Sequence, residues 1–222
     1  MASHNVAVFD LDYTLLDDDS ENRWAQFMFE HNLVNNAFVD RIAVYYEDYK
    51  KGSLNGRDYE EFLLRPLADN PPETMHALRD EYLKSVRRMI RPRMAAHLKQ
   101  HRNRKDSLLL LSASNSFLVE PIGVMLGFPN HKDAPCIISS EVEITNGKYT
   151  GRLAGGHNMG HGKVQKFTNW LETNHLGLGG SWGYGDSLND LPILMLVEHP
   201  VAVSPDPVLR QHAVQNNWEI ID

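Results

Sequence analysis

Residues 6–14 read Val6-Ala7-Val8-Phe9-Asp10-Leu11-Asp12-Tyr13-Thr14, an unbroken apolar run that leads into two aspartates. Four consecutive apolar residues are typical of a short strand that is covered on both faces, as in a parallel sheet. The two aspartates are two positions apart, so their side chains would point to the same side if the strand continued that far. This stretch therefore predicts a buried strand that delivers a pair of carboxylates to the edge of a sheet.

A long region without any strand pattern follows. Over residues 17–87, apolar and aromatic side chains recur at helical spacing, and the run Asn70-Pro71-Pro72 interrupts them. We therefore expect several helices here, forming an all-helical cap that is inserted after the first strand.

From about Pro92 onward, strand and helix patterns alternate. The sequence predicts strands at Ser107–Leu111, Pro135–Ser139, Trp182–Tyr184, Val201–Val203 and Trp218–Ile221. It predicts helices at Arg93–His101, Phe117–Leu126, Lys163–His175 and Leu191–Val197. The Asn146-Gly147 dipeptide predicts a hairpin. Strands separated by helices imply an α/β protein with a doubly wound parallel sheet, whose core comprises residues 1–16 and 88–222 and whose helical cap comprises residues 17–87.

Polar loops follow three of the expected strands. Asp10-Leu11-Asp12 follows the first, Ser112-Ala113-Ser114-Asn115 the second, and Gly185-Asp186-Ser187-Leu188-Asn189-Asp190 a later one. In doubly wound sheets, ligands bind beyond the carboxyl ends of the strands, where such loops meet. We therefore expect all three loops to converge on one site.

The residue types in these loops suit a phosphate site with a divalent cation. Asp10 and Asp12 would repel each other unless a cation lies between them, and Asp186 would add a third carboxylate. Oxygen ligands without clustered histidine or cysteine favour Mg²⁺. Lys163, which follows a glycine-rich run, can neutralise part of this charge. The Ser112 hydroxyl can donate to a phosphate oxygen near a helix N-terminus.

Each of these features also has an ordinary structural explanation. Paired aspartates after a strand are often turn residues, serine and asparagine cap helices, and a lone lysine is usually solvated. This chain combines all four features in order, each beyond an expected strand or at the start of an expected helix. The combination favours a joint chemical role.

Composition narrows the possible partners. The chain has 222 residues, 29 acids against 22 bases and a net charge of −7, which argues against nucleic acid or an anionic membrane as a partner. The single cysteine, Cys136, excludes an internal disulfide framework. No export signal is recognisable, and the longest apolar run, Leu108–Leu111, is far shorter than the roughly 20 residues that span a bilayer. We expect a cytoplasmic protein, monomeric or homodimeric, that acts on a small molecule.

The four features together resemble the four motifs of the haloacid-dehalogenase-like hydrolase superfamily. The matching residues are Asp10-x-Asp12-x-Thr14, Ser112, Lys163 and Gly185-Asp186-Ser187-x-Asn189-Asp190. The helical insertion resembles the cap of the phosphoserine-phosphatase-like subfamily, so the resemblance covers nearly the whole chain. It implies a Mg²⁺-dependent phosphomonoester hydrolase with an aspartyl-phosphate intermediate, acting on a small phosphorylated metabolite.

The resemblance also implies a role for each motif residue. Asp10 would be the nucleophile and Asp12 the general acid and base. Ser112 and Lys163 would bind the phosphoryl oxygens. The residues that would hold or orient the metal are Asp10, Asp12 through its main-chain carbonyl, Asp186 and Asp190. The residues expected to contact the substrate are Asp19, Ser114, Asn115 and Asn189.

Two departures from the subfamily pattern bear on the substrate. Phosphoserine phosphatases carry a glycine pair after the serine of the second motif, where this chain has Ala113-Ser114. Their cap supplies a glutamate and an arginine; Asp19 lies where the glutamate would fall, but no arginine aligns cleanly. The acids of residues 17–21 and Trp24 instead suggest a mouth for a cationic leaving group, or a solvated linker with a helix cap. Histidinol phosphate is the favoured substrate, and phosphoserine is the alternative.

Other hypotheses stay open at this stage. The same fold serves phosphotransferases and phosphomutases. The stretch Arg87–Lys105 contains eight basic residues and no acid, so a non-enzyme alternative is a binding module for nucleic acid or an acidic protein. A solvated helix face explains this stretch more simply. His157 and His161 have a spacing that would bind zinc on a helix, but the surrounding glycines favour a loop on the substrate side.

Overall fold

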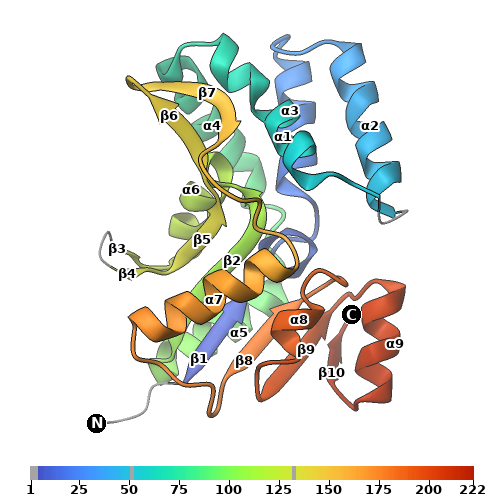
Figure 1. Cartoon of the computed structure of the whole chain (residues 1–222), viewed down its shortest axis with the longest axis vertical. Coiled ribbons are helices and arrows are strands. Elements are labelled where there is room, and N and C mark those ends of the chain that lie inside the picture. Colours follow the sequence, from blue (N-terminus) through green and yellow to red (C-terminus); the bar gives the residue numbers. More distant parts are fainter. Residues whose placement is uncertain (1–4, 51–52, 132–133) are drawn as a thin grey trace.

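The computed structural model describes residues 5–50, 53–131 and 134–222 (Figure 1). Its centre is a six-stranded parallel sheet with the order β10-β9-β8-β1-β2-β5. The strands are β1 (Val6–Phe9), β2 (Ser107–Asn115), β5 (Ile137–Ser140), β8 (Trp182–Gly185), β9 (His199–Val203) and β10 (Glu219–Ile221). Strand β1 lies between β2 and β8, so the predicted α/β fold with a parallel sheet is confirmed.

Helices cover both faces of this sheet. The helices that follow the cap are α5 (Pro92–Arg104), α6 (Ser116–Leu126), α7 (His161–Thr173), α8 (Leu191–Leu194) and α9 (Pro207–Gln215). Ala7 and Phe9 point to the face on which α5 and α6 pack. Val6 and Val8 point to the opposite face, which α7 and α8 cover. Alternate side chains of a strand point to opposite faces, which explains why all of β1 is apolar and buried.

The cap is built from helices inserted after β1. They are α1 (Ser20–Glu30), α2 (Asn36–Lys50), α3 (Gly56–Asp69) and α4 (Pro72–Val86). The Asp19 carboxylate caps α1, and Pro72 occupies the first turn of α4, where a missing N–H costs nothing. The predicted all-helical insertion is confirmed. The exact division at residues 17 and 87 stays a prediction, because one hydrophobic cluster joins Phe9 of the sheet to Leu63 of the cap.

A hairpin of the core reaches the cap. Strands β6 (Val142–Thr145) and β7 (Lys148–Leu153) pair in the antiparallel sense, and β7 packs along α3 (Figure 1). The turn residues Asn146 and Gly147 have φ angles of 52° and 75°, as a tight hairpin turn of this kind requires. Through this hairpin, the core contacts helix α3 of the cap.

Several boundaries differ from the sequence prediction. Strand β2 does not stop at Leu111 but continues to Asn115, because it pairs with β5 as far as Ser140. The short antiparallel pair β3 (Asn130–His131) and β4 (Ala134–Pro135) takes the place of the start of the strand predicted at Pro135. Helix α9 was not predicted. In the described part of the chain, no helix is long and apolar enough to cross a membrane.

Candidate active site

A cavity of about 410 Å³ lies beyond the carboxyl ends of β1, β2 and β8. The core contributes polar residues to its wall, including Asp10, Asp12, Ser112, Ser114, Lys163, Asp186 and Asn189. The cap contributes Asp19, Glu21, Tyr45, Tyr59 and Glu60, among others. The structure thus brings the three predicted polar loops to one place and covers that place with the cap.

Lys163 joins two carboxylates at the core side of the cavity. Its Nζ lies 2.6 Å from Oδ1 of Asp10 and 2.6 Å from Oδ1 of Asp190. Burial opposes the positive charge, but the two carboxylates outweigh burial and raise the pKa of Lys163. Burial raises the pKa of Asp10 to about 7, although the Lys163 ammonium lowers it in part. The charged forms of these buried groups therefore depend on one another.

Asp12 is held apart from this group by hydrogen bonds to both of its oxygens. Oδ1 accepts the backbone N–H of Ser20 at 2.7 Å, and Oδ2 accepts the Ser114 hydroxyl at 2.7 Å. Burial and the charge of Asp19 raise the pKa of Asp12 to about 7, and the two hydrogen bonds lower it in part. A carboxyl group whose pKa lies near neutrality can both donate and accept a proton at physiological pH.

The backbone between these two aspartates changes direction sharply. The N–H of Asp10 donates to the carbonyl of Tyr184 at 3.0 Å, which continues the pairing of β1 with β8. A tight, irregular turn over Leu11–Leu15 follows, in which Asp12 is extended and Tyr13 adopts the left-handed conformation with a φ of 57°. Such a φ is uncommon for a residue with a side chain, and strain of this kind concentrates at functional sites. The turn directs Asp12 toward the start of α1.

Three carboxylates of the core could hold a metal ion. Asp10, Asp186 and Asp190 each offer an oxygen, and these oxygens lie within 4.8 Å of one another. Burial and the neighbouring charges of Asp190 and Asp10 raise the pKa of Asp186 well above its usual value. A set of crowded oxygen donors without nitrogen or sulfur fits a hard divalent cation such as Mg²⁺.

The segment before α7 is tied to the sheet at two points. The side-chain amide of Asn158 donates to the Ser112 carbonyl, and the backbone N–H of Asn158 donates to the Ser140 hydroxyl at 3.0 Å. Ser112 in turn accepts the N–H of Ser114 on its hydroxyl oxygen at 3.1 Å. These bonds place the start of α7, and with it Lys163, against the end of β2.

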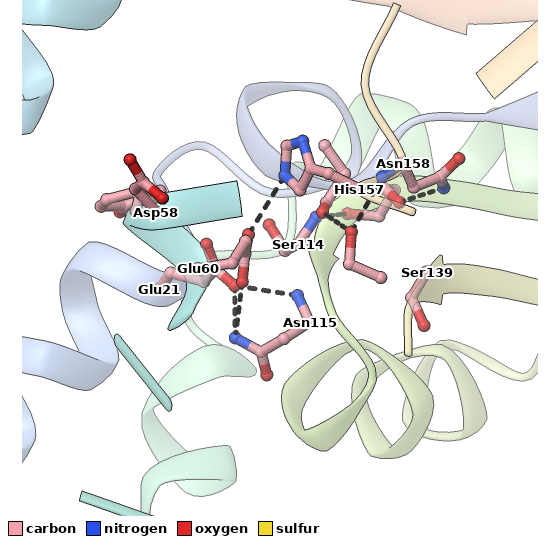
Figure 2. Close-up of polar contacts among 12 residues, drawn as sticks. Glu21, Asp58, Glu60, Ser114, Asn115, Ser139, His157 and Asn158 are labelled. Atoms are coloured by element: carbon pink, nitrogen blue, oxygen red, sulfur yellow. Dashed lines mark hydrogen bonds and ion pairs between the residues drawn. The ribbon is translucent and has the colours of Figure 1, made fainter. Parts of the chain in front are cut away.

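The cap side of the cavity holds a second group of buried polar residues (Figure 2). Glu21 of α1 and Glu60 of α3 are 3% and 2% exposed. The backbone N–H of Asn115 donates to Glu21 at 2.8 Å, and its side-chain amide donates to Glu21 and, at 3.5 Å, to Glu60. Nε2 of His157 lies 3.6 Å from Oε1 of Glu60. Burial and the charge of Glu60 raise the pKa of Glu21 well above its usual value.

His157 also lies close to the first residue of α3. A Cβ atom built on Gly56 would lie 2.5 Å from Nδ1 of His157, which is closer than carbon and nitrogen atoms can approach. The cap therefore touches the segment before α7 at a position where it has no side chain.

Most residues expected to contact the substrate do line the cavity. Asp19, Ser114 and Asn189 are part of its wall. Asn115 lies at the end of β2, where its side-chain amide donates to the cap carboxylates Glu21 and Glu60, and its contact with the substrate stays a prediction. Trp24 is placed differently from the prediction, since it packs against Phe27, Tyr82 and Phe117 in the hydrophobic cluster.

The sequence analysis missed three residues that shape the site. Glu60 precedes Glu61 on a helix, and nothing in that pair shows which one is buried. Asp206 accepts the backbone N–H groups of Leu188 and Leu209, which holds the loop that carries Asp186; its position before Pro207 was a detectable helix-start signal. Asn158 lies in a glycine-rich run that resembles an ordinary loop.

The zinc hypothesis for the two histidines gains no support. The side chain of His161 lies outside the described part of the structure. Among the described residues, the acidic group that could hold a metal does not include His157. Within the basic stretch, Arg91 donates to the Leu16 carbonyl at 3.1 Å and Arg102 to the Leu126 carbonyl at 2.8 Å, so at least these two side chains have structural partners.

Comparisons with known proteins agree with this arrangement. The family model described as haloacid dehalogenase-like hydrolase matches residues 7–195. A histidinol-phosphatase of Neisseria meningitidis serogroup C (strain 8013) is 32% identical over 224 residues, which is 98% of each chain. A solved structure of a protein with unknown function from Bordetella pertussis Tohama I has a TM-score of 0.89 and 32% identity, covering 100% of this chain and 99% of that one.

A substrate-bound phosphoserine phosphatase has the same fold. Its solved structure superimposes with a TM-score of 0.73 and 17% identity over 100% of this chain and 94% of that chain. Because the identity is low, this likeness concerns the arrangement of sheet and cap and not the substrate.

Proposed function

This chain belongs to the haloacid dehalogenase-like hydrolase family and is a phosphatase, and we propose that it hydrolyses a small phosphate monoester by way of an aspartyl phosphate on Asp10. The observation that carries this proposal is that two neighbouring aspartates have different hydrogen-bond partners. Asp10 is bound to a buried lysine, whereas Asp12 is held separately by Ser114 and Ser20.

The proposed reaction has two displacements at phosphorus. A carboxylate oxygen of Asp10 attacks phosphorus, the bond from phosphorus to the alcohol oxygen breaks, and Asp12 gives its proton to the departing alkoxide. Water then attacks the same phosphorus, Asp12 takes a proton from it, and the bond to the Asp10 oxygen breaks. Inorganic phosphate and the free alcohol are the products, and both aspartates return to their starting states.

Lys163 and Ser112 would stabilise the charge on the phosphoryl oxygens. Both line the cavity beside Asp10, and Lys163 is fixed by Asp190 on its other side. Donors that are already in position stabilise developing charge without the cost of reorganisation. Asp10, Asp186 and Asp190 would hold or orient Mg²⁺, which neutralises phosphoryl charge when bound.

Histidinol phosphate is the substrate that we propose. A relative that is 32% identical over nearly the full length carries the name histidinol-phosphatase. The wall of the cavity also includes Asp19, Glu21 and Glu60, which suit a leaving group that carries positive charge. Phosphoserine adds a carboxylate, for which this acidic wall is less suited.

A phosphatase screen tests the proposal. Purified protein with Mg²⁺ is assayed on histidinol phosphate, phosphoserine, a nucleotide and a sugar phosphate, and we expect the highest kcat/KM on histidinol phosphate. Brief incubation with ³²P-labelled substrate, followed by acid quenching, should leave label on the peptide that contains Asp10. Absence of any phosphate release, or label on a different residue, would contradict the mechanism. Transfer of the phosphate to an added alcohol in place of water would indicate a phosphotransferase.

A further inference from the structure

The two sides of the cavity differ in how their negative charge is compensated. The wall contains seven acidic side chains, Asp10, Asp12, Asp19, Glu21, Glu60, Asp186 and Asp206, and two permanently basic ones, Arg91 and Lys163. Lys163 is bound to Asp10 and Asp190 at the core side. Arg91 donates through Nε to the Leu16 carbonyl. Neither contact reaches the cap carboxylates.

Few neighbouring groups offset the negative charge of Glu21 and Glu60. Both accept from the Asn115 side chain, and the contact to Glu60 is 3.5 Å long, at the limit of a hydrogen bond. His157 Nε2 lies 3.6 Å from Glu60, which is an ion-pair distance only when the ring is protonated. Glu21 also accepts the backbone N–H of Asn115 at 2.8 Å. Two carboxylates that are at least 97% buried and whose hydrogen bonds come from neutral groups of one residue leave negative charge that a ligand can offset.

Asp19 is less available to bind a cationic ligand, because its carboxylate already caps a helix. Its Oδ1 accepts the backbone N–H groups of Glu21 at 2.9 Å and Asn22 at 2.8 Å, so this oxygen caps α1. A carboxylate used in this way is already stabilised by the helix terminus. Glu60, whose contacts are 3.5 Å and 3.6 Å long, is therefore the acidic group of the cap with the most remaining capacity to bind a cation, and Glu21 lies beside it through the shared Asn115 amide.

An aromatic wall lies beside the two glutamates. Tyr59 and Tyr45 line the same cavity, with ring centroids 5.4 Å apart in an edge-to-face arrangement. The Tyr59 hydroxyl donates to Asn22 at 3.3 Å, which fixes the ring. Aromatic faces attract organic cations, so this wall and the carboxylates favour the same kind of ligand group.

We propose that Glu21 and Glu60 bind the cationic nitrogen of the substrate and thereby select phosphate monoesters of amino alcohols that carry no carboxylate. This inference rests on the proposed function, because the phosphate must lie at Asp10 for the other end of the ester to reach the cap. A substrate carboxylate at the same place would meet two buried like charges, so it would be rejected.

The first test compares two esters of similar size on the wild-type protein. Histidinol phosphate carries an ammonium group, whereas 3-phenylpropyl phosphate carries no cation. A hydrogen bond to a charged group contributes enough to predict a kcat/KM that is about 10- to 100-fold higher for histidinol phosphate. Equal kcat/KM values for the two esters would overturn the inference while leaving the phosphatase activity established.

The second test uses variants. Glu60→Gln and Glu21→Gln should each lower the ratio of the two kcat/KM values by about 10-fold or more, because the charge is lost and the shape is kept. Glu61→Gln is the matched control: Glu61 is the next residue on α3, lies outside the cavity wall and pairs with Arg57 at 3.0 Å. Its ratio should equal that of the wild type. Equal losses on both esters in the two cavity variants would contradict a role in selectivity.

A binding measurement separates failure of this inference from failure of the proposed function. Calorimetry with the product alcohol histidinol on the wild-type protein needs no turnover. We expect saturable binding that Glu60→Gln weakens about 10-fold or more and that 3-phenylpropanol does not reproduce. Binding without hydrolysis would support the cation site and refute the phosphatase proposal. Hydrolysis without a preference for the cationic ester would refute the cation site and support the phosphatase proposal.

Discussion

The core side and the cap side of one cavity differ in how buried negative charge is compensated. At the core side, Lys163 lies 2.6 Å from each of two carboxylates. At the cap side, Glu21 and Glu60 share the amide of Asn115, with His157 at a longer distance. A buried charge is stable only when it is paired and hydrogen-bonded. We expect this difference if the core side carries out the proposed reaction and the cap side binds a ligand that brings its own charge.

Replacing Asp10, the proposed nucleophile, tests the core side most severely. Asp10→Asn keeps the size of the side chain but removes its ability to attack phosphorus, so we expect kcat to fall by at least about 10³-fold. The variant should keep the wild-type circular dichroism spectrum. Asp17→Asn, at an exposed residue outside the cavity wall, is the control and should retain full activity. Appreciable turnover by the Asp10 variant would exclude an aspartyl phosphate at this position.

Removing the metal tests whether Lys163 alone balances the core carboxylates. Chelation with EDTA should reduce phosphate release to background, and added Mg²⁺ should restore it, since Asp10, Asp186 and Asp190 crowd oxygens within 4.8 Å. Mg²⁺ should also raise the Tm, because a ligand that binds only the folded state stabilises it. A chelated protein with full activity would disprove the metal requirement.

Removing the buried cation should affect both chemistry and stability. Lys163→Gln leaves Asp10 and Asp190 without their ammonium partner, so kcat should fall by about 10²- to 10³-fold. Unfolding in urea should show a loss of about 3–5 kcal/mol, because breaking a buried ion pair strands a charge. Lys166→Gln, one turn along α7 and bonded to the Ser139 carbonyl at 2.8 Å, is the control with a much smaller expected effect.

Ser114→Ala tests the proposed role of Asp12 in proton transfer. The Ser114 hydroxyl lowers the pKa of Asp12 from the value that burial alone would give, so its loss should raise that pKa above about 7. Asp12 must be ionised to take a proton from water, so the acidic limb of the kcat profile should move to higher pH. We expect about a 10-fold lower kcat at pH 6 and a smaller loss at pH 8. An unchanged acidic limb would show that Asp12 does not set it.

The smallest effect is expected at Asp206. Its carboxylate caps α9 and accepts the N–H of Leu188, in the loop that carries Asp186. Asp206→Ala should lower the free energy of unfolding by about 1 kcal/mol, the usual cost of a lost helix cap, and reduce kcat only a few-fold. The Tm and kcat of this variant check both values. A loss of activity as large as that of the Lys163 variant would mean that Asp206 acts directly on substrate or metal.

The core side was largely predictable from the sequence, and the cap side was not. Parallel strands place their carboxyl ends at one edge, so the polar loops after β1, β2 and β8 had to meet once the strands were recognised. The position of Glu60 depends on how α3 packs on β7, which no local pattern encodes. The contacts of Asn115 with Glu21 and Glu60 were missed for a related reason: they depend on the extension of β2, and that extension follows from pairing with β5.

Gly56 sets the clearance between the two halves of the molecule. A Cβ there would come within 2.5 Å of the His157 ring, so any side chain at position 56 would have to displace that ring. Because His157 also lines the cavity and lies 3.6 Å from Glu60, a larger residue at position 56 would change the shape of the cavity and the pairing of Glu60 together. Position 56 therefore links the volume of the cavity to its electrostatics through a single histidine ring.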